Sequence, residues 1–223
     1  SLPVTGGSYS RPARFGVAQS NRLISAGSQA TLTGDGSTMW FSVLMNATSG
    51  GTNSGYALNS HGAIIFGDTA FGLGDPATAP ITNAGNALGV SFDGIDGDFN
   101  NVAVRGLTYL GGSQAWDTNA ITVGANTVMI VGKIDWAANG TDDVLNLYNI
   151  TDPTAPLPTA FTTMTADWDQ STFNMVAIGQ GQTEVFDEIR FDTTLAGVGV
   201  VPEPSSAALL GLGGVALLLR RRK

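Results

Sequence analysis

Oxygen-bearing side chains gather in a glycine-rich stretch near the middle of the chain. They belong to Asp93, Asp96, Asp98 and Asn100. Carboxylate and amide oxygens are the ligands that Ca²⁺ prefers in proteins, and the spacing from Asp96 to Asn100 matches the start of an EF-hand loop. Asn101 stands where that loop requires glycine, so an EF-hand is excluded. The stretch predicts either a calcium site of the β-sandwich type, with Ca²⁺ as the candidate cofactor, or an ordinary turn rich in Asp and Gly.

Acidic residues also gather near the end of the body, where a glycosidase could use a pair of facing carboxyl groups. Strict alternation along a strand places Glu184, Glu188 and Arg190 on one face. Phe186 shares that face, whereas Asp187 points to the other. We therefore expect an ion pair between Glu188 and Arg190 and a structural role for Asp187. No catalytic residue is expected, so the protein is predicted not to be an enzyme, and a glycoside hydrolase is the enzymatic alternative.

His61 is the chain's single histidine, and the chain has no cysteine. A Ser–His–acid triad would have to use His61, but no Gly-x-Ser-x-Gly nucleophile elbow occurs. A zinc site would need further His or Cys ligands. The neighbours Asn59, Ser60 and Gly62 instead predict a solvent-facing loop at His61.

Two tryptophans are candidates for binding a sugar. Trp116 lies next to Asp117, and Trp168 lies between Asp167 and Asp169, so both have polar, loop-like surroundings in the sequence. An exposed indole ring can stack on the apolar face of a pyranose while the carboxylates accept hydrogen bonds from its hydroxyls. Alternatively, the rings close the ends of a sandwich core and their N–H groups find partners inside the protein. The first interpretation makes a polysaccharide the candidate partner.

The charge of the chain is acidic and unevenly distributed. Its 223 residues carry a formal net charge of −8, and four of the ten basic residues are the last four. An acidic body repels nucleic acid, because phosphate binding requires clustered Lys and Arg. The absence of cysteine excludes disulfides. Hydrophobic residues make up 43% of the chain, which is enough for a core that needs no such cross-links.

The C-terminal tail has three physically distinct parts. They are Pro202-Glu203-Pro204, the apolar run 207–219, and the basic end Arg220, Arg221, Arg222 and Lys223. A helix over the apolar run would span roughly 20 Å, which crosses a ~30 Å hydrocarbon core only with flanking residues or local thinning. A buried core helix is the alternative, but the run has no polar face. The basic end would stay in the cytoplasm, and the body would face outward.

The order and spacing of these three parts resemble the PEP-CTERM sorting signal of Gram-negative bacteria. The resemblance implies export, anchoring in the inner membrane through the C-terminal helix, and recognition by an exosortase that processes the protein near Pro-Glu-Pro. It further implies a final place at the cell surface or in an extracellular matrix. Proteins with this signal are linked to exopolysaccharide and biofilm production.

The body reads as a series of short strands separated by turns. Runs of β-branched, aromatic and alternating residues occur at 39–45, 62–67, 87–92, 101–107, 120–123, 127–136, 142–150, 174–179 and 184–191. The two runs around 137–141 predict a hairpin. No long stretch before residue 205 has helical periodicity, so an all-β sandwich is expected. The predicted organisation is a lead-in at 1–10, a sandwich at 11–197, a linker at 198–205 and an apolar helix with a basic end at 206–223.

Three stretches of the body resemble the LamG-like branch of the concanavalin A-like superfamily. They are residues 38–45, residues 131–136 together with 145–148, and residues 185–191. The resemblance implies an antiparallel jelly-roll β-sandwich. We expect a non-enzymatic cell-surface or matrix protein, and the alternative is a carbohydrate-binding module that calcium assists.

Overall fold

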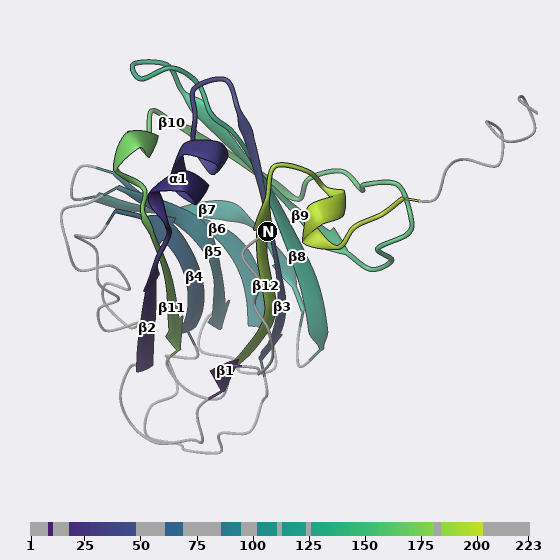
Figure 1. Cartoon of the computed structure of the whole chain (residues 1–223). Helices are drawn as coiled ribbons and strands as arrows, with labels where there is room; N and C mark the ends of the chain where they lie inside the picture. The colour runs from purple at the N-terminus through teal and green to yellow at the C-terminus, as the bar shows by residue number, and fades with distance from the viewer. Residues whose placement is uncertain are drawn as a thin grey trace, which may run out of the picture.

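The computed structural model shows two antiparallel sheets packed face to face (Figure 1). It describes residues 9–10, 18–47, 61–68, 86–94, 102–110, 113–123, 126–180 and 184–202. Each sheet has six strands, and neighbouring strands run antiparallel. The predicted all-β sandwich is therefore confirmed.

The two sheets divide the chain without regard to sequence order. Sheet A has the order β1 (Tyr9–Ser10), β12 (Glu184–Asp192), β3 (Thr38–Ala47), β8 (Thr127–Asp135), β9 (Asp143–Ile150), β10 (Thr162–Ala166). Sheet B has the order β2 (Ala18–Leu23), β11 (Met175–Gln180), β4 (His61–Gly67), β5 (Ala87–Gly94), β6 (Val102–Leu110), β7 (Ser113–Thr122). The helical pieces are α1 (Ala26–Leu32), η2 (Gln170–Thr172) and η3 (Ala196–Val198).

Alternation along the central strands builds the core between the sheets. On β3, the residues Met39, Phe41, Val43 and Met45 are each no more than 3% exposed. They pack with apolar residues of sheet B, because successive strand residues point to opposite faces. Gly132 of β8 lies directly opposite Phe41, and its missing side chain leaves the space that the Phe41 ring fills.

One end of the core is closed by aromatic rings. Trp136 and Phe173 meet edge to face at 5.6 Å between ring centroids, and Phe66 contacts both rings. Trp136 donates its indole N–H to the Leu32 carbonyl at 2.7 Å, which ties the end of α1 to this cluster. Apolar rings fill the core end while the polar indole atom finds a backbone acceptor, as buried tryptophans require.

Several elements differ from the sequence prediction. His61 was expected in a loop, but it begins β4 and pairs with Asp93 of β5. The predicted hairpin is confirmed as β8 and β9. Helix α1 and the strands β2 and β10 were not predicted, because their small polar residues give no clear period. Strand β1 lies within the predicted lead-in 1–10, where no strand was expected, and it pairs with β12. The packed unit also extends past 197, because Val198 and Val200 are fully buried.

Gly132→Ala tests the space that Phe41 occupies. An added Cβ would lie 2.0–2.7 Å from three atoms of the Phe41 ring, and this ring is 3% exposed inside the core. We expect the free energy of unfolding to fall by about 1–3 kcal/mol, as in other overpacked cores. Gly27→Ala on α1 is the control, because a Cβ there meets nothing within 4 Å. Urea denaturation measures both, and equal midpoints for the two variants would contradict this account.

Candidate functional site

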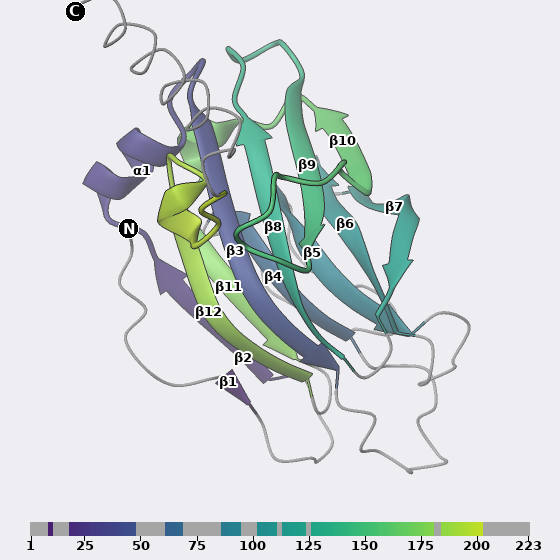
Figure 2. The same ribbon diagram turned by 90° about the vertical axis from the view of Figure 1, so that its right-hand side faces the viewer.

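The chain that leads to the tail lies across the outer face of sheet A (Figure 2). We call residues 193–201 the C-terminal strap. Val198 and Val200 are 0% and 1% exposed, and they form one apolar cluster with residues of β8 and β9. Those partners are Val131, Tyr148 and Ile150. The strap therefore covers an apolar part of the sheet that would otherwise face water.

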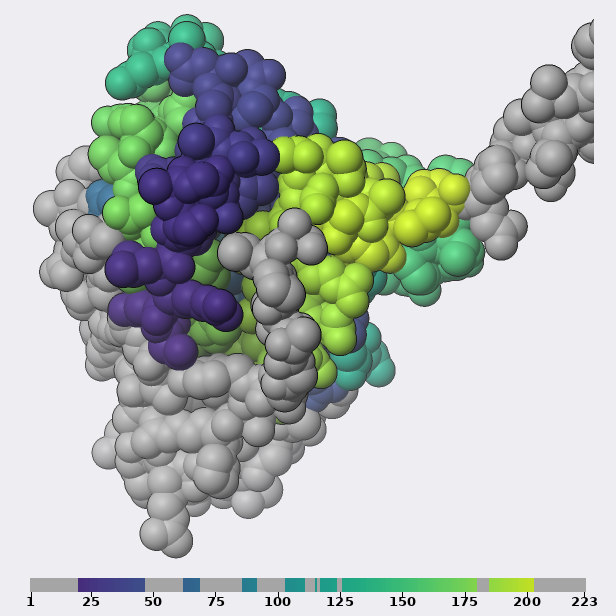
Figure 3. All heavy atoms as spheres, in the orientation of Figure 1, coloured from purple at the N-terminus to yellow at the C-terminus, as the bar shows by residue number. Residues whose placement is uncertain are grey.

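Hydrogen bonds fix the shape of the strap. The amide of Val198 donates to the Leu195 carbonyl at 3.2 Å, and that of Gly199 donates to Ala196 at 3.0 Å. Gly199 has φ +89°, a left-handed conformation that glycine adopts without strain. The amide of Val201 then donates to the Pro153 carbonyl at 2.9 Å, which fixes the end of the strap to the segment after β9. Figure 3 shows the strap, in yellow, forming one continuous surface with the residues beside it.

The start of the strap is organised by a carboxylate. Asp192 accepts from the amide and the hydroxyl of Thr194 at 2.9 and 2.8 Å. Burial raises the pKa of Asp192, but these hydrogen bonds outweigh burial and hold the pKa below its ordinary value. A Cβ on Gly197 would lie 2.0 Å from the Asp192 carboxyl carbon. A side chain at position 197 would therefore have to displace the Asp192 carboxylate from its hydrogen bonds with Thr194.

Pro202 is the last residue that the structure describes, and it directly follows the strap. Residues 200–223 match the PEP-CTERM protein-sorting motif. The resemblance predicted for the tail is thereby confirmed. The other motif residues, namely Glu203, Pro204, Arg220, Arg221 and Arg222, lie outside the described residues. Within the described part of the chain, no helix is long and apolar enough to cross a membrane.

The solved structures that match the chain are distant from it in sequence. The globular domain of T. cruzi calreticulin has 11% identity and a TM-score of 0.42, covering 83% of this chain and 72% of its own. CG-16, a homodimeric agglutinin from chicken liver, has 9% identity and a TM-score of 0.37, covering 78% and 100%. A SAP-like pentraxin from Limulus polyphemus has 8% identity and a TM-score of 0.38, covering 77% of each chain. No curated protein sequence matches the chain.

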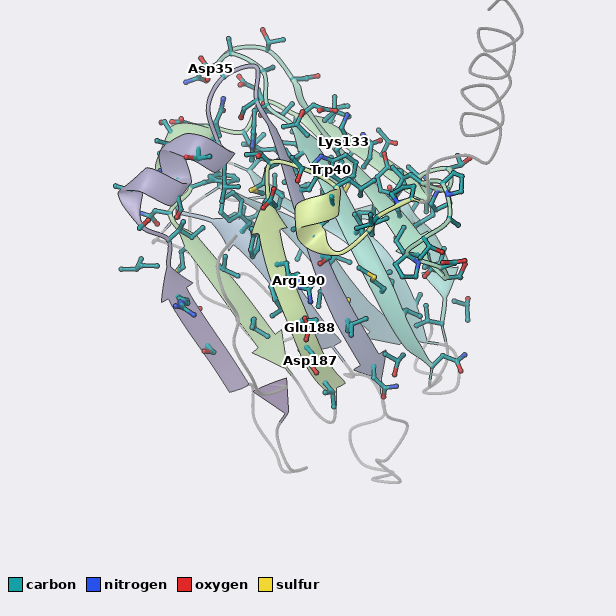
Figure 4. All side chains as sticks on the ribbon, turned by 45° about the vertical axis from the view of Figure 1, so that its right-hand side comes forward. Asp35, Trp40, Lys133, Asp187, Glu188 and Arg190 are labelled. Atoms are coloured by element: carbon teal, nitrogen blue, oxygen red, sulfur yellow. The ribbon has the colours of Figure 1, made fainter. Side chains whose placement is uncertain are left out.

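A second feature of the outer face of sheet A is a row of polar and aromatic residues, which we call the Trp40 row. Cross-strand pairing aligns Asp192, Trp40, Lys133, Asn146 and Thr163 over five neighbouring strands. The side chains in this row interact: Lys133 Nζ lies 5.9 Å from the Trp40 ring centroid, and the Thr163 hydroxyl donates to Asn146 Oδ1 at 2.7 Å. Figure 4 shows Trp40 and Lys133 next to each other on neighbouring strands.

Trp40 is partly exposed and held in place from two sides. Its ring stacks with that of Tyr148 at 6.3 Å and 29°. Lys133 pairs with Asp135 at 2.6 Å, and Asp135 also accepts from the Thr38 hydroxyl at 2.7 Å. Burial raises the pKa of Tyr148, which is 9% exposed in the apolar cluster under the strap. The row therefore presents a fixed aromatic ring with hydrogen-bonding groups of both polarities beside it.

The sequence did not single out Trp40. The sequence predicted a strand at 39–45, and the structure places its alternate residues Trp40, Ser42 and Leu44 on the outer side of sheet A, where Ser42 is 2% exposed and the other two are partly exposed. The polar residue Ser42 within that alternation is the signal that could have revealed an outer face. Which residues stand beside Trp40 depends on strand pairing, and the sequence pattern does not give that pairing.

Trp168 does not lie in an exposed sugar-binding platform as predicted, because its side chain is 0% exposed. Asp143 of β9 accepts from the Trp168 amide at 2.9 Å, and this bond holds the backbone where the ring enters the core. The indole Nε1 is buried and has no hydrogen-bond partner among the described residues. The alternative interpretation, a ring that closes the core, is thus correct in position, although its N–H is not satisfied as expected.

Trp116 lies on a strand and not in the predicted loop. It belongs to β7 and pairs with Leu107 of β6. Leu107 is 0% exposed, and its cross-strand partner on the other side is Gly89. The side chain of Trp116 lies outside the described residues, so its role in sugar binding stays a prediction.

Most of the predicted calcium ligands lie outside the residues that the structure describes. Asp93 lies on β5 between His61 and Ala103, whereas Asp96, Asp98 and Asn100 belong to a stretch that the structure does not describe. Among the described residues, no group of three or more His, Cys, Asp or Glu is placed to hold a metal. The calcium site stays a prediction.

The acidic residues of β12 are arranged by a β-bulge. Between Asp187 and Arg190 the register shifts, and Glu188 has φ +50°. Arg190 donates to Glu188, so the predicted ion pair is confirmed. The face assigned to Phe186 was wrong: it lies in the core, 1% exposed, with Ile189. The bulge adds one residue to β12. Phe186 before it and Ile189 and Phe191 after it therefore all lie on the core side of the sheet, which strict alternation would not allow.

Asp143 is a buried carboxylate, 1% exposed. It accepts from the Ala137 amide at 2.7 Å and from the Trp168 amide at 2.9 Å. Burial raises its pKa, the two backbone donors oppose that rise, and the charges of Asp167 and Asp142 add to it. A raised carboxyl pKa suits a general acid, but these bonds and the burial leave Asp143 no contact with a substrate.

Asp143→Asn tests this buried group. Because folding raises the pKa of Asp143, its contribution to stability is full below the unfolded pKa and is lost as pH rises through the folded pKa. The side-chain amide of the introduced Asn has only one acceptor oxygen, so its NH₂ group would point at one of the two backbone N–H donors, Ala137 or Trp168. We expect the free energy of unfolding to fall by about 1–3 kcal/mol, and to fall more in acid than at neutral pH.

Urea denaturation at several pH values between acid and neutral measures this difference. Asn139→Ala, at an exposed position of the turn between β8 and β9, is the control, because it changes no charge. A loss that is the same at every pH would contradict the raised pKa of Asp143.

Proposed function

We propose that the chain is an exported cell-surface or extracellular-matrix protein whose tail anchors it in the inner membrane of a Gram-negative bacterium and delivers it to an exosortase. The observation that carries this proposal is the match of residues 200–223 to the PEP-CTERM sorting motif. The part displayed outside is a non-enzymatic β-sandwich, a jelly roll of the concanavalin A-like, LamG-like type.

The arrangement of the acidic groups supports a role without catalysis. Asp143 is enclosed by backbone donors, and Glu188 is paired with Arg190. Asp187 accepts from the Glu188 amide at 2.8 Å across the bulge. Each of these carboxyl groups thus has a structural partner, whereas glycoside hydrolysis needs two carboxyl groups that face a shared substrate.

Replacing Pro202, Glu203 and Pro204 together by alanine tests the sorting role. We expect the variant to remain with the inner membrane, because the processing enzyme no longer recognises it. Cell fractionation and protease accessibility on intact cells measure the outcome. The control replaces the exposed prolines Pro156 and Pro158 by alanine. Surface exposure of the triple variant equal to that of the control would contradict the sorting role.

A second candidate function is carbohydrate binding by the sandwich, and the Trp40 row favours it. A partly exposed indole ring with Lys133, Asp135 and Asn146 beside it offers a surface for the apolar face of a sugar ring and partners for its hydroxyls. Because the chain carries a net charge of −8, a neutral polysaccharide is the expected ligand class.

Trp40→Ala tests this function. We expect the Kd for a bound neutral oligosaccharide to rise about tenfold, because the stacking surface is lost. Leu23→Ala is the control, since Leu23 is 66% exposed on sheet B. Isothermal titration with calcium and again with EDTA measures binding. Calcium-dependent binding would implicate Asp93, Asp96 and Asp98, whereas binding that Trp40→Ala leaves unchanged would exclude the Trp40 row.

A further inference from the structure

We propose that the folded sandwich gates its own sorting signal: the C-terminal strap must detach from sheet A before the exosortase can bind the Pro-Glu-Pro segment. This inference rests on the sorting function proposed above and adds a regulation of the same site. The strap is the moving part, and the apolar cluster on the outer face of sheet A is its seat.

The sorting motif begins inside the packed part of the chain. The match starts at residue 200, and Val200 is 1% exposed against sheet A. The amide of Val201 is bonded to the Pro153 carbonyl at 2.9 Å. Pro202, the first residue of Pro-Glu-Pro, follows immediately. No spacer therefore separates the last residue held by the sandwich from the signal.

The docked strap also has the wrong shape for an enzyme cleft. Peptide-binding sites commonly take an extended segment whose backbone groups are free to pair. Residues 196–198 form a 3₁₀ turn, and the turn continues into the left-handed Gly199. The amides of Val200 and Val201 already donate to Leu195 and Pro153. These bonds must break before the residues upstream of Pro202 can extend.

Detachment leaves the sandwich folded. Val198 and Val200 belong to a cluster on the outer face of sheet A, and the core between the sheets is a separate cluster. The strap makes no strand pairing. Short segments held by few apolar contacts open far more often than the strands beneath them. An enzyme that acts on the opened form then works at a rate set by the opening equilibrium.

Gly199→Ala shifts that equilibrium without touching the signal. Gly199 has φ +89°, where an alanine is disfavoured by about tenfold. An added Cβ would also lie 2.6 Å from Arg190 Nη1, the end of a flexible side chain that can shift, so the docked strap becomes less populated by about that factor. Gly140→Ala is the matched control: Gly140 has φ +90° in the turn between β8 and β9, and a Cβ there meets nothing within 4 Å. A second variant inserts Gly-Ser-Gly-Ser after Val201, which moves the signal away from an intact strap.

The full chain is co-expressed with an exosortase in Gram-negative cells, and loss of the tail is followed over time by mass. Hydrogen exchange at the amides of Val200 and Val201 reports strap opening in the same variants. We expect Gly199→Ala to raise both the exchange and the processing rate about tenfold. The insertion should raise the processing rate alone, and Gly140→Ala should change neither.

The outcomes separate the gate from the sorting role. Equal processing rates in all four proteins would overturn the gate while leaving the sorting role intact. Faster exchange in Gly199→Ala without faster processing would show that the enzyme binds the docked strap, which also overturns the gate. If neither the parent chain nor any variant is processed, the sorting role itself fails, and the gate fails with it.

Discussion

The buried carboxylate of Asp143 holds together the loops at the end of the sandwich where aromatic rings close the core. Asp143 accepts from two backbone amides that belong to different segments, the turn after β8 and the segment that carries Trp168. Gln170, 3% exposed, adds a second link by donating from Nε2 to Asp35 Oδ1 at 2.8 Å and to the Ala137 carbonyl at 2.7 Å. A buried backbone donor without a partner is costly. These bonds therefore fix the positions of three loops, which carry Asp35, Ala137 and Trp168.

The hydrogen bonds of Asp143 and Gln170 explain why the aromatic residues at this end of the sandwich are almost fully buried. The bond to Asp143 fixes the backbone at Trp168, and the Trp168 ring lies in the same core cluster as Phe173. Phe173 in turn meets Trp136 and Phe66. A charge that is expensive to bury thus positions rings whose burial is favourable, and the second effect offsets the first.

The features that could be predicted from the sequence are those that depend on residues close together in the chain. The β8–β9 hairpin and the tail were predicted because a strand pattern, a short turn and the Pro-Glu-Pro order all lie within a few residues. The position of Phe186 was not, because a bulge at Glu188 adds one residue and reverses the alternation. Trp168 looked exposed because its neighbours are Asp residues, yet the group that buries it is Asp143, 25 residues away in sequence. The partners of Trp40 come from pairing between distant strands, which residue patterns alone do not specify.

The strap also determines how the protein responds to mechanical load. When the chain is pulled from its C-terminal end, the load acts first on the Val201–Pro153 bond and then on Val200 and Val198 in turn. Contacts loaded one after another yield at lower force than strands loaded together, so the strap peels while β12 stays paired with β3. Nine released residues lengthen the tether by up to roughly 30 Å. The strap therefore detaches and extends under load before the sandwich unfolds.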